Sequence, residues 1–145
     1  MQLCGNIFLN EKHNVTPFYI ALSGPEDKGK TVKLSIVSED GGGSTICETT
    51  EAVIAQEEVA AATIDSYGIQ NVGLIKLDIE GNELEALKGA ETTILRYRPH
   101  ILFEVNKGDF SELKKTNIFD FFKARGYEVA EIKPFDNMFY AAPTP

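Results

Sequence analysis

Residues 74–90, LIKLDIEGNELEALKGA, constrain the fold most, because the hydrophobic period changes abruptly within them. Residues 72–79 are almost wholly apolar, which is typical of a strand that is covered on both faces. Apolar residues then recur at helical spacing as far as Pro99, which ends the helix. The junction between the two carries three acids: Asp78, Glu80 and Glu83. The sequence therefore predicts a strand, a helix and a set of polar side chains where the strand ends.

Strands and helices alternate along the rest of the chain. Strands are predicted from β-branched, aromatic or alternating runs at residues 15–24, 30–40, 59–63, 100–106, 128–135 and 137–143. A second helix is predicted over residues 110–126, and the last two strands are expected to form an antiparallel hairpin. This order favours an α/β class with a mostly parallel sheet, and the length of 145 residues predicts one domain over residues 1–145.

The predicted sheet brings polar residues to one edge. Ligands of such sheets bind at the carboxyl ends of the strands. Asp78 lies at the end of one strand, and Glu104 with Asn106 lies at the end of the next. Since side chains alternate along a strand, Lys76 shares the face of Asp78, and Asn106 that of Glu104. We therefore expect a site at this edge.

Other polar residues near the junction have structural interpretations. Glu83 and Glu85 fall in the first turn of the predicted helix, where acids offset the helix dipole. Asn82 is expected to cap that helix, with Glu85 as its partner. Asp65 is expected to be a turn or cap residue rather than a ligand.

Composition excludes several classes of protein. The chain holds 14 basic and 22 acidic residues, which gives a net charge of −8. It has no basic cluster of the kind that binds nucleic acid, and an acidic surface disfavours anionic membranes. Cys4 and Cys47 match no metal-ligand spacing and are expected to be free thiols. No apolar run is long enough to span a membrane, so the cytoplasm is the expected location.

Several of these segments match a known family at fixed spacing. IKLDIEGNELEALKGA, RPHILFEVN and FFKARGYEV together resemble the FkbM family of S-adenosylmethionine-dependent methyltransferases. Weaker matches, among them ALSG, GGGST and TIDSYG, extend the resemblance over nearly the whole chain. The resemblance implies a Rossmann-like sheet of the class I methyltransferases, mostly parallel with an antiparallel C-terminal strand.

The family pattern also contains two strands for which this sequence shows no counterpart. In the family, the first ends in a glycine-rich turn that holds the cofactor, and the second ends in an acid that takes the ribose hydroxyls. The chain resembles the third to seventh strands, so we expect a truncated or partial domain. Strand 72–78 would then lose a neighbour, and an open strand edge favours self-association into a homo-oligomer.

The resemblance assigns candidate catalytic roles to the acids. Methyl transfer to a hydroxyl requires a group that takes its proton, and Asp78 is the first candidate, followed by Glu104. Glu80 has two candidate roles, which are orienting the substrate and capping the loop. A divalent cation between Asp78 and Glu104 would find suitable oxygen ligands, but no third ligand is evident, and a metal is not favoured.

The resemblance also assigns binding roles. Ala21, Leu22 and Ser23 fall where the family holds the adenine of S-adenosylmethionine, and Asp78 would also contact the cofactor. Lys76 and Asn106 are candidates for binding a sugar or another small acceptor.

Three functions remain open from the sequence. The first is methyl transfer to oxygen by a domain of the FkbM type. The second is a catalytically inactive remnant of that domain, which would bind a partner through its open strand edge. The third is an unrelated carboxylate-based hydrolase, although no nucleophile motif such as G-x-S-x-G is present.

Overall fold

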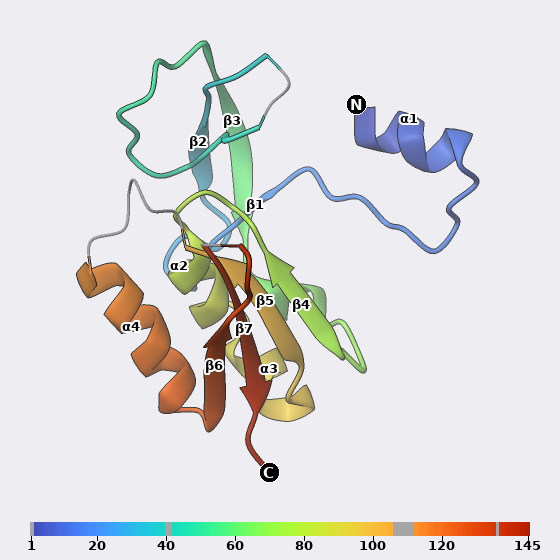
Figure 1. The fold of residues 1–145 in the computed structure, drawn as a ribbon. Helices are drawn as coiled ribbons and strands as arrows, with labels where there is room; N and C mark the ends of the chain where they lie inside the picture. Colours follow the sequence, from blue (N-terminus) through green and yellow to red (C-terminus); the bar gives the residue numbers. More distant parts are fainter. Residues whose placement is uncertain (1, 40–41, 106–111, 136) are drawn as a thin grey trace.

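The computed structural model describes residues 2–39, 42–105, 112–135 and 137–145. The elements are α1 (Gln2–Leu9), β1 (Ala21–Leu22), β2 (Thr31–Ile36), β3 (Ala55–Ala62), the 3-10 helix η1 (Ile64–Tyr67), β4 (Leu74–Leu77), α2 (Glu83–Lys88), α3 (Glu91–Tyr97), β5 (His100–Glu104), α4 (Glu112–Lys123), β6 (Tyr127–Glu131) and β7 (Met138–Pro143). Figure 1 shows α2, α3 and α4 beside a four-stranded sheet, the β2–β3 hairpin projecting beyond the carboxyl end of β4, and α1 set apart.

The four-stranded sheet has the order β4-β5-β7-β6. β4 and β5 are parallel, and β7 is antiparallel to both of its neighbours. Therefore β4, β5 and β6 run in one direction, and only β7 runs against them. The predicted antiparallel hairpin of the last two strands is confirmed, and the fold is a mixed α/β arrangement.

The expectation of one sheet is wrong, because β1, β3 and β2 form a second sheet in that order. β2 and β3 are antiparallel, and β1 adds a short parallel pairing to the end of β3. Most residues of β3 are exposed, so the strand offers no continuous apolar face to the core. The hairpin consequently stands apart from the four-stranded sheet.

Alternation along β4 and β5 separates a core face from an open face. Ile75 and Leu77 are buried, whereas Leu74 and Lys76 are exposed. The expectation that this strand is covered on both faces is therefore wrong, because only the face of Ile75 and Leu77 belongs to the buried core. The inward residues pack against the helices. The ring of Phe103 contacts that of Phe122 in α4 in a tilted arrangement and stacks with that of Phe139 in β7, with centroid distances of 5.0 and 5.5 Å. The buried cluster comprises Ile75, Leu77, Ala86, Leu87, Ala90, Ile94, Ile101, Phe103, Val105, Ile118, Phe121, Phe122, Tyr127, Phe139 and Ala141.

Two predicted elements differ from the observed ones. The predicted strand 15–24 is reduced to Ala21–Leu22, because the preceding residues have no strand partner. The single helix predicted after residue 82 is two helices, separated at Gly89 and Ala90. Gly89 lies so close to the end of β1 that a Cβ atom there would be 2.3 Å from the carbonyl oxygen of Ser23. The break between α2 and α3 therefore coincides with the point where the Ser23 backbone approaches Gly89 most closely.

Asp65 caps the second of these helices from a distant part of the chain. Its carboxylate accepts hydrogen bonds from the backbone N–H groups of Thr92 and Thr93, both at 2.9 Å, and from the Thr93 hydroxyl at 2.7 Å. Burial acts to raise the pKa of Asp65, but these hydrogen bonds outweigh it, and the pKa lies below its ordinary value. The cap interpretation of Asp65 is therefore confirmed, although the helix it caps begins 26 residues later.

Asp65→Ala is expected to lower the free energy of unfolding by about 1–2 kcal/mol at pH 7, because two helix N–H groups lose their acceptor. A carboxyl whose pKa is lowered by folding stabilises the protein above its ordinary pKa of about 3.9 and loses this effect as the pH falls further. Urea unfolding from pH 7 to pH 3 should therefore show the gap between wild type and variant closing below about pH 4. Glu58→Ala, at an exposed position of β3, is the control. A gap that stays constant over this range would contradict the prediction.

Candidate functional site

A cavity of about 850 Å³ lies beside the carboxyl end of β4. β1 contributes Ala21 and Leu22 to its lining, and β4 and the residue after it contribute Lys76 and Asp78. Apolar side chains from η1 and from the residues before β1 form much of the remaining wall. The cavity thus joins predicted cofactor residues to a predicted catalytic acid.

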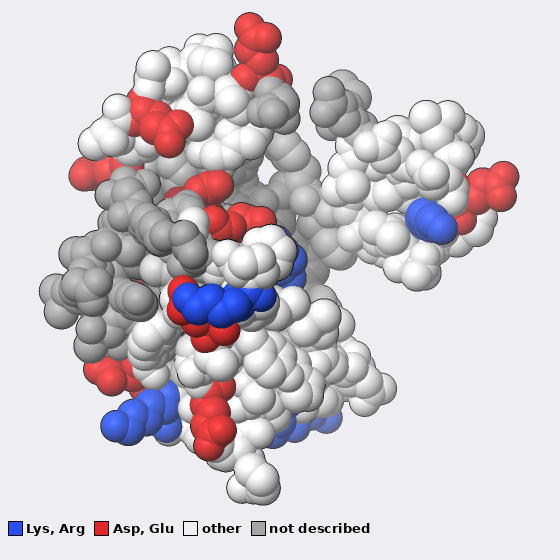
Figure 2. All heavy atoms as spheres, viewed as in Figure 1, with Lys and Arg blue, Asp and Glu red and all other residues white. Residues whose placement is uncertain are grey.

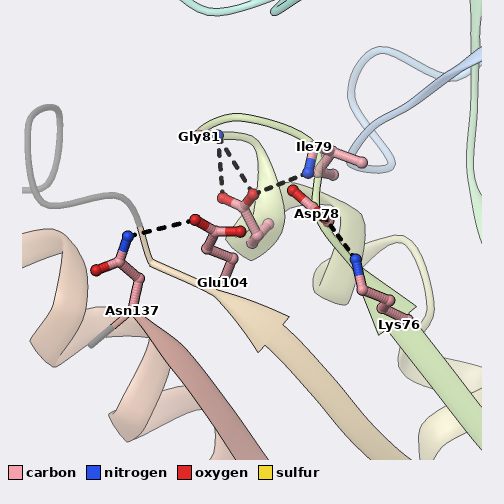
Figure 3. A network of polar contacts seen from close by, with 7 residues as sticks. Lys76, Asp78, Ile79, Gly81, Glu104 and Asn137 are labelled. Atoms are coloured by element: carbon pink, nitrogen blue, oxygen red, sulfur yellow. Dashed lines mark hydrogen bonds and ion pairs between the residues drawn. The ribbon is translucent and has the colours of Figure 1, made fainter. Parts of the chain in front are cut away.

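Asp78 follows β4 directly and faces the same side as Lys76. Their side chains form an ion pair of 2.6 Å, with 50% of Lys76 and 43% of Asp78 exposed. Figure 3 shows this pair at the edge of the sheet where the strands end. The carboxylate is therefore accessible and held by a neighbouring cation, which suits a group that must meet a substrate.

Glu104 ends β5 beside Asp78, as predicted from the alternation. Its carboxylate accepts a hydrogen bond from the Asn137 side chain at 3.4 Å. Glu104 is not among the residues that line the cavity. Its catalytic role stays a prediction, and the geometry favours Asp78 as the acid nearer to a bound ligand.

The other predicted site residues lie differently. Glu80 adopts a left-handed backbone conformation with φ of 54°, and its carbonyl accepts a hydrogen bond of 2.6 Å from the Thr45 hydroxyl. The Ser23 side chain is buried and donates to Asp27 at 3.1 Å, and it does not line the cavity. Asn106 lies outside the described residues. Of the predicted cofactor triplet, only Ala21 and Leu22 reach the cavity.

Asn82 was predicted to cap α2, and this prediction is wrong. The residue occupies the N-cap position, but its side chain makes no capping hydrogen bond. Instead its amide donates to the carbonyl of Leu22 at 2.8 Å. Asn82 also lines the cavity, so it ties the acid-bearing turn to β1. Local sequence gives no signal for a contact that spans 60 residues.

Glu83 is the buried acid of the site. Only 1% of the residue is exposed, and its carboxylate accepts hydrogen bonds from the backbone N–H groups of Ile79 at 3.2 Å and Gly81 at 3.1 Å. Burial raises the pKa of the Glu83 carboxyl above its ordinary range, although these N–H groups act in the opposite direction. Figure 3 shows the turn that these hydrogen bonds hold. The helix-dipole interpretation of Glu83 is therefore incomplete.

Charge and metal-binding groups are sparse around the site. Among the described residues, no group of three or more His, Cys, Asp or Glu side chains is placed to hold a metal ion. Figure 2 shows one face of the molecule, on which acidic side chains lie over both the hairpin and the body, with basic ones between them. Of the residues that the structure describes, the charged ones on the cavity wall are Lys76 and Asp78, and the other polar residues of the wall are Thr16, Ser44, Tyr67 and Asn82.

Comparison with known proteins places this chain in a family. The pattern of the methyltransferase FkbM domain matches residues 2–129. This match covers most of the chain, and the chain belongs to the FkbM methyltransferase domain family. The resemblance of its motifs to that family is thus confirmed.

Individual known proteins are more distant. The crystal structure of methyltransferase FkbM from Methylobacillus flagellatus KT is 25% identical in sequence and has a TM-score of 0.43. The matched part covers 58% of this chain and 23% of that one, so the chain spans less than a quarter of that protein's length. No curated protein matches the sequence.

Proposed function

We propose that the chain forms part of an S-adenosylmethionine-dependent methyltransferase of the FkbM type that methylates an oxygen of a sugar or another small metabolite. The observation that carries this proposal is the shared cavity of Ala21, Leu22, Lys76 and Asp78. The strand order, with β7 inserted antiparallel between β5 and β6, supports a partial Rossmann-like sheet of the class I methyltransferases.

The residues present fit part of the cofactor. Apolar side chains of β1 and η1 suit a flat, weakly polar ring, and polar residues, among them Lys76 and Asp78, line the same cavity. Ala21 and Leu22 line the cavity and would contact the adenine of the cofactor. When bound, S-adenosylmethionine supplies an electrophilic methyl group.

The acids and Lys76 define the remaining chemistry. Asp78 takes the proton from the acceptor hydroxyl, since its carboxylate is exposed at the cavity. Lys76 holds that carboxylate in place and contacts the acceptor. Glu104 does not line the cavity and is the second candidate for the base. Glu80 has two candidate roles, orienting the substrate and capping the loop, and a metal ion is not favoured.

Calorimetric titration with S-adenosylmethionine tests the proposal. Saturable binding by the wild-type chain is expected, and Ala21→Leu, which narrows the cavity, should weaken it about tenfold or more. Ala130→Leu, at an exposed position of β6, is the matched control and should bind normally. A folded wild type that does not bind the cofactor would refute the proposal for this chain.

One observation favours the second candidate, a catalytically inactive interaction module. β4 lies at the end of its sheet, and Leu74 on this strand is 59% exposed. An open strand edge is a template for pairing with another chain, so a homo-oligomer joined through β4 is the corresponding assembly. Molar mass measured on the same samples separates the candidates: dimers without cofactor binding support the module.

Two observations bear on the cellular location of the protein. Among the described residues, no helix combines the length and apolarity that crossing a membrane needs. The two cysteines, Cys4 and Cys47, are not joined by a disulfide, which suits a reducing compartment. We therefore propose the cytoplasm as the location, with no role in binding nucleic acid or membranes.

A further inference from the structure

The turn at residues 78–81 includes a glutamate, Glu80, in a backbone conformation that residues with a side chain rarely adopt. Glu80 and Gly81 are both in left-handed conformations, with φ of 54° and 104°. A residue with a Cβ atom at positive φ is strained by about 1 kcal/mol or more, and such strain persists only where surrounding contacts hold it. The contacts that hold this turn therefore decide where Asp78 and Ile79, which both line the cavity, are directed.

Glu83 supplies the central contact. One oxygen of its carboxylate accepts from the N–H groups of Ile79 and Gly81, and the other oxygen accepts from Gly81 as well. These two N–H groups flank Glu80, so the carboxylate holds the strained residue from both sides. Among the described residues, no basic side chain pairs with Glu83, and the donors to its carboxylate are backbone groups.

Burial of the Glu83 carboxylate is unfavourable in free energy, so its position needs a reason beyond the helix dipole. A buried carboxylate is unfavourable unless its oxygens are hydrogen-bonded, and a residue that only offsets a helix dipole does not need burial. Glu85 stands in the same first turn of α2 and is half exposed, in an ion pair of 2.6 Å with Lys88. The two acids share a helix terminus, but only Glu83 reaches back to the turn.

We propose that Glu83 is a positioning residue, whose buried carboxylate fixes the 78–81 turn and thereby directs Asp78 into the cavity. This inference rests on the proposed function for its catalytic meaning. The structural part, that Glu83 holds the turn, stands independently. Thr45 supports the same turn from the hairpin, through its hydrogen bond to the Glu80 carbonyl.

Hydrogen exchange of single backbone amides, followed by NMR on the whole chain, tests the structural part. In Glu83→Ala, protection of the Ile79 and Gly81 amides should fall about tenfold to a hundredfold, because both lose their acceptor. Glu83→Gln should lose less, since its amide oxygen can still accept from both groups. Glu85→Gln is the matched control, and both amides should stay protected in it.

Two reference amides identify the cause of any loss of exchange protection at Ile79 and Gly81. The Ala86 amide donates to the Asn82 carbonyl at the start of α2. The Ile132 amide donates to the Met138 carbonyl in the distant β6–β7 hairpin. Both should keep their protection in Glu83→Gln. Loss of protection at Ile132 as well would indicate global destabilisation, and equal effects of Glu83→Ala and Glu85→Gln on the Ile79 and Gly81 amides would indicate only the helix dipole. Either result would overturn the proposal.

Cofactor titration of the same variants tests the functional part. Glu83→Ala should weaken S-adenosylmethionine binding or slow methyl transfer by about tenfold, with Glu83→Gln losing less and Glu85→Gln unchanged. A loosened turn with unaltered binding and transfer would overturn the positioning role. If wild type itself does not bind the cofactor, the proposed function fails, while the exchange data still decide whether Glu83 holds the turn.

Discussion

Asp78→Asn is expected to slow methyl transfer by about 10²–10⁴-fold, the usual contribution of a positioned general base. The amide is nearly the same size as the carboxylate, but it cannot take a proton from the acceptor hydroxyl. The carboxylate lines the cavity and is paired with Lys76, so its removal also leaves that cation without its partner. The rate should be measured at saturating S-adenosylmethionine, with calorimetry to show that the variant still binds the cofactor.

Glu104→Gln provides the comparison for Asp78→Asn. Glu104 lies outside the cavity wall and contacts Asn137, so its substitution should slow transfer by about tenfold or less. The opposite ranking, with Glu104→Gln nearly inactive and Asp78→Asn within about threefold of wild type, would move the base to Glu104. Equal losses would indicate that the two carboxylates act together.

Gly89→Ala is expected to lower the free energy of unfolding by about 2–3 kcal/mol, because overpacked sites relax only by moving their neighbours. The new Cβ atom would lie 2.3 Å from the Ser23 carbonyl oxygen and 3.1 Å from the Thr63 side chain. The first contact is with backbone, so a change of rotamer cannot relieve it. The backbone at Gly89, with φ of −71°, suits alanine, so the cost comes from the contact alone.

Thermal unfolding checks this prediction, with an expected fall in Tm of roughly 5–10 °C for a chain of this size. Gly73→Ala is the matched control, since no atom lies within 4 Å of a Cβ there. It should be neutral or slightly stabilising, because alanine restricts the unfolded chain. Since Leu22 precedes the displaced Ser23, Gly89→Ala should also weaken cofactor binding. A Tm equal to that of the control would show that the end of β1 can move aside.

The strands and their faces were predictable where periodicity was strong. The alternation along β4 placed Leu74, Lys76 and Asp78 on one face, and the structure agrees. The apolar run indicated that both faces are covered, but this face is exposed. Such alternation follows directly from strand geometry and needs no knowledge of tertiary contacts. The position of Asp78 at the edge of the sheet followed from the same geometry.

Contacts between distant segments were not predictable in this way. Asn82 has the composition of a helix cap, yet its side chain bonds to Leu22 across 60 residues. The helix break at Gly89 depends on the approach of Ser23, and local pattern alone indicates an uninterrupted helix there. In both cases tertiary packing overrides a local preference.

Glu83 shows the same limit in the candidate site. An acid in the first helical turn has a sufficient local explanation in the helix dipole. The spacing from Ile79 and Gly81 to Glu83 was visible, but only the left-handed backbone of the turn brings those N–H groups to the carboxylate. A glycine just before the N-cap residue of a helix, with an acid at the first helical position, is the signal that points to such a turn.

The insertion of β7 between β5 and β6 bears on how the protein is made. A ribosome releases β4, β5, α4 and β6 before residues 138–143 emerge, so β5 and β6 have no strand between them during that interval. The nascent chain then exposes two unpaired edges and the uncovered ring of Phe103, which later packs against Phe139. The sheet can therefore close only after this last strand has been synthesised, and a chaperone that shields apolar strands would be most useful just before that moment.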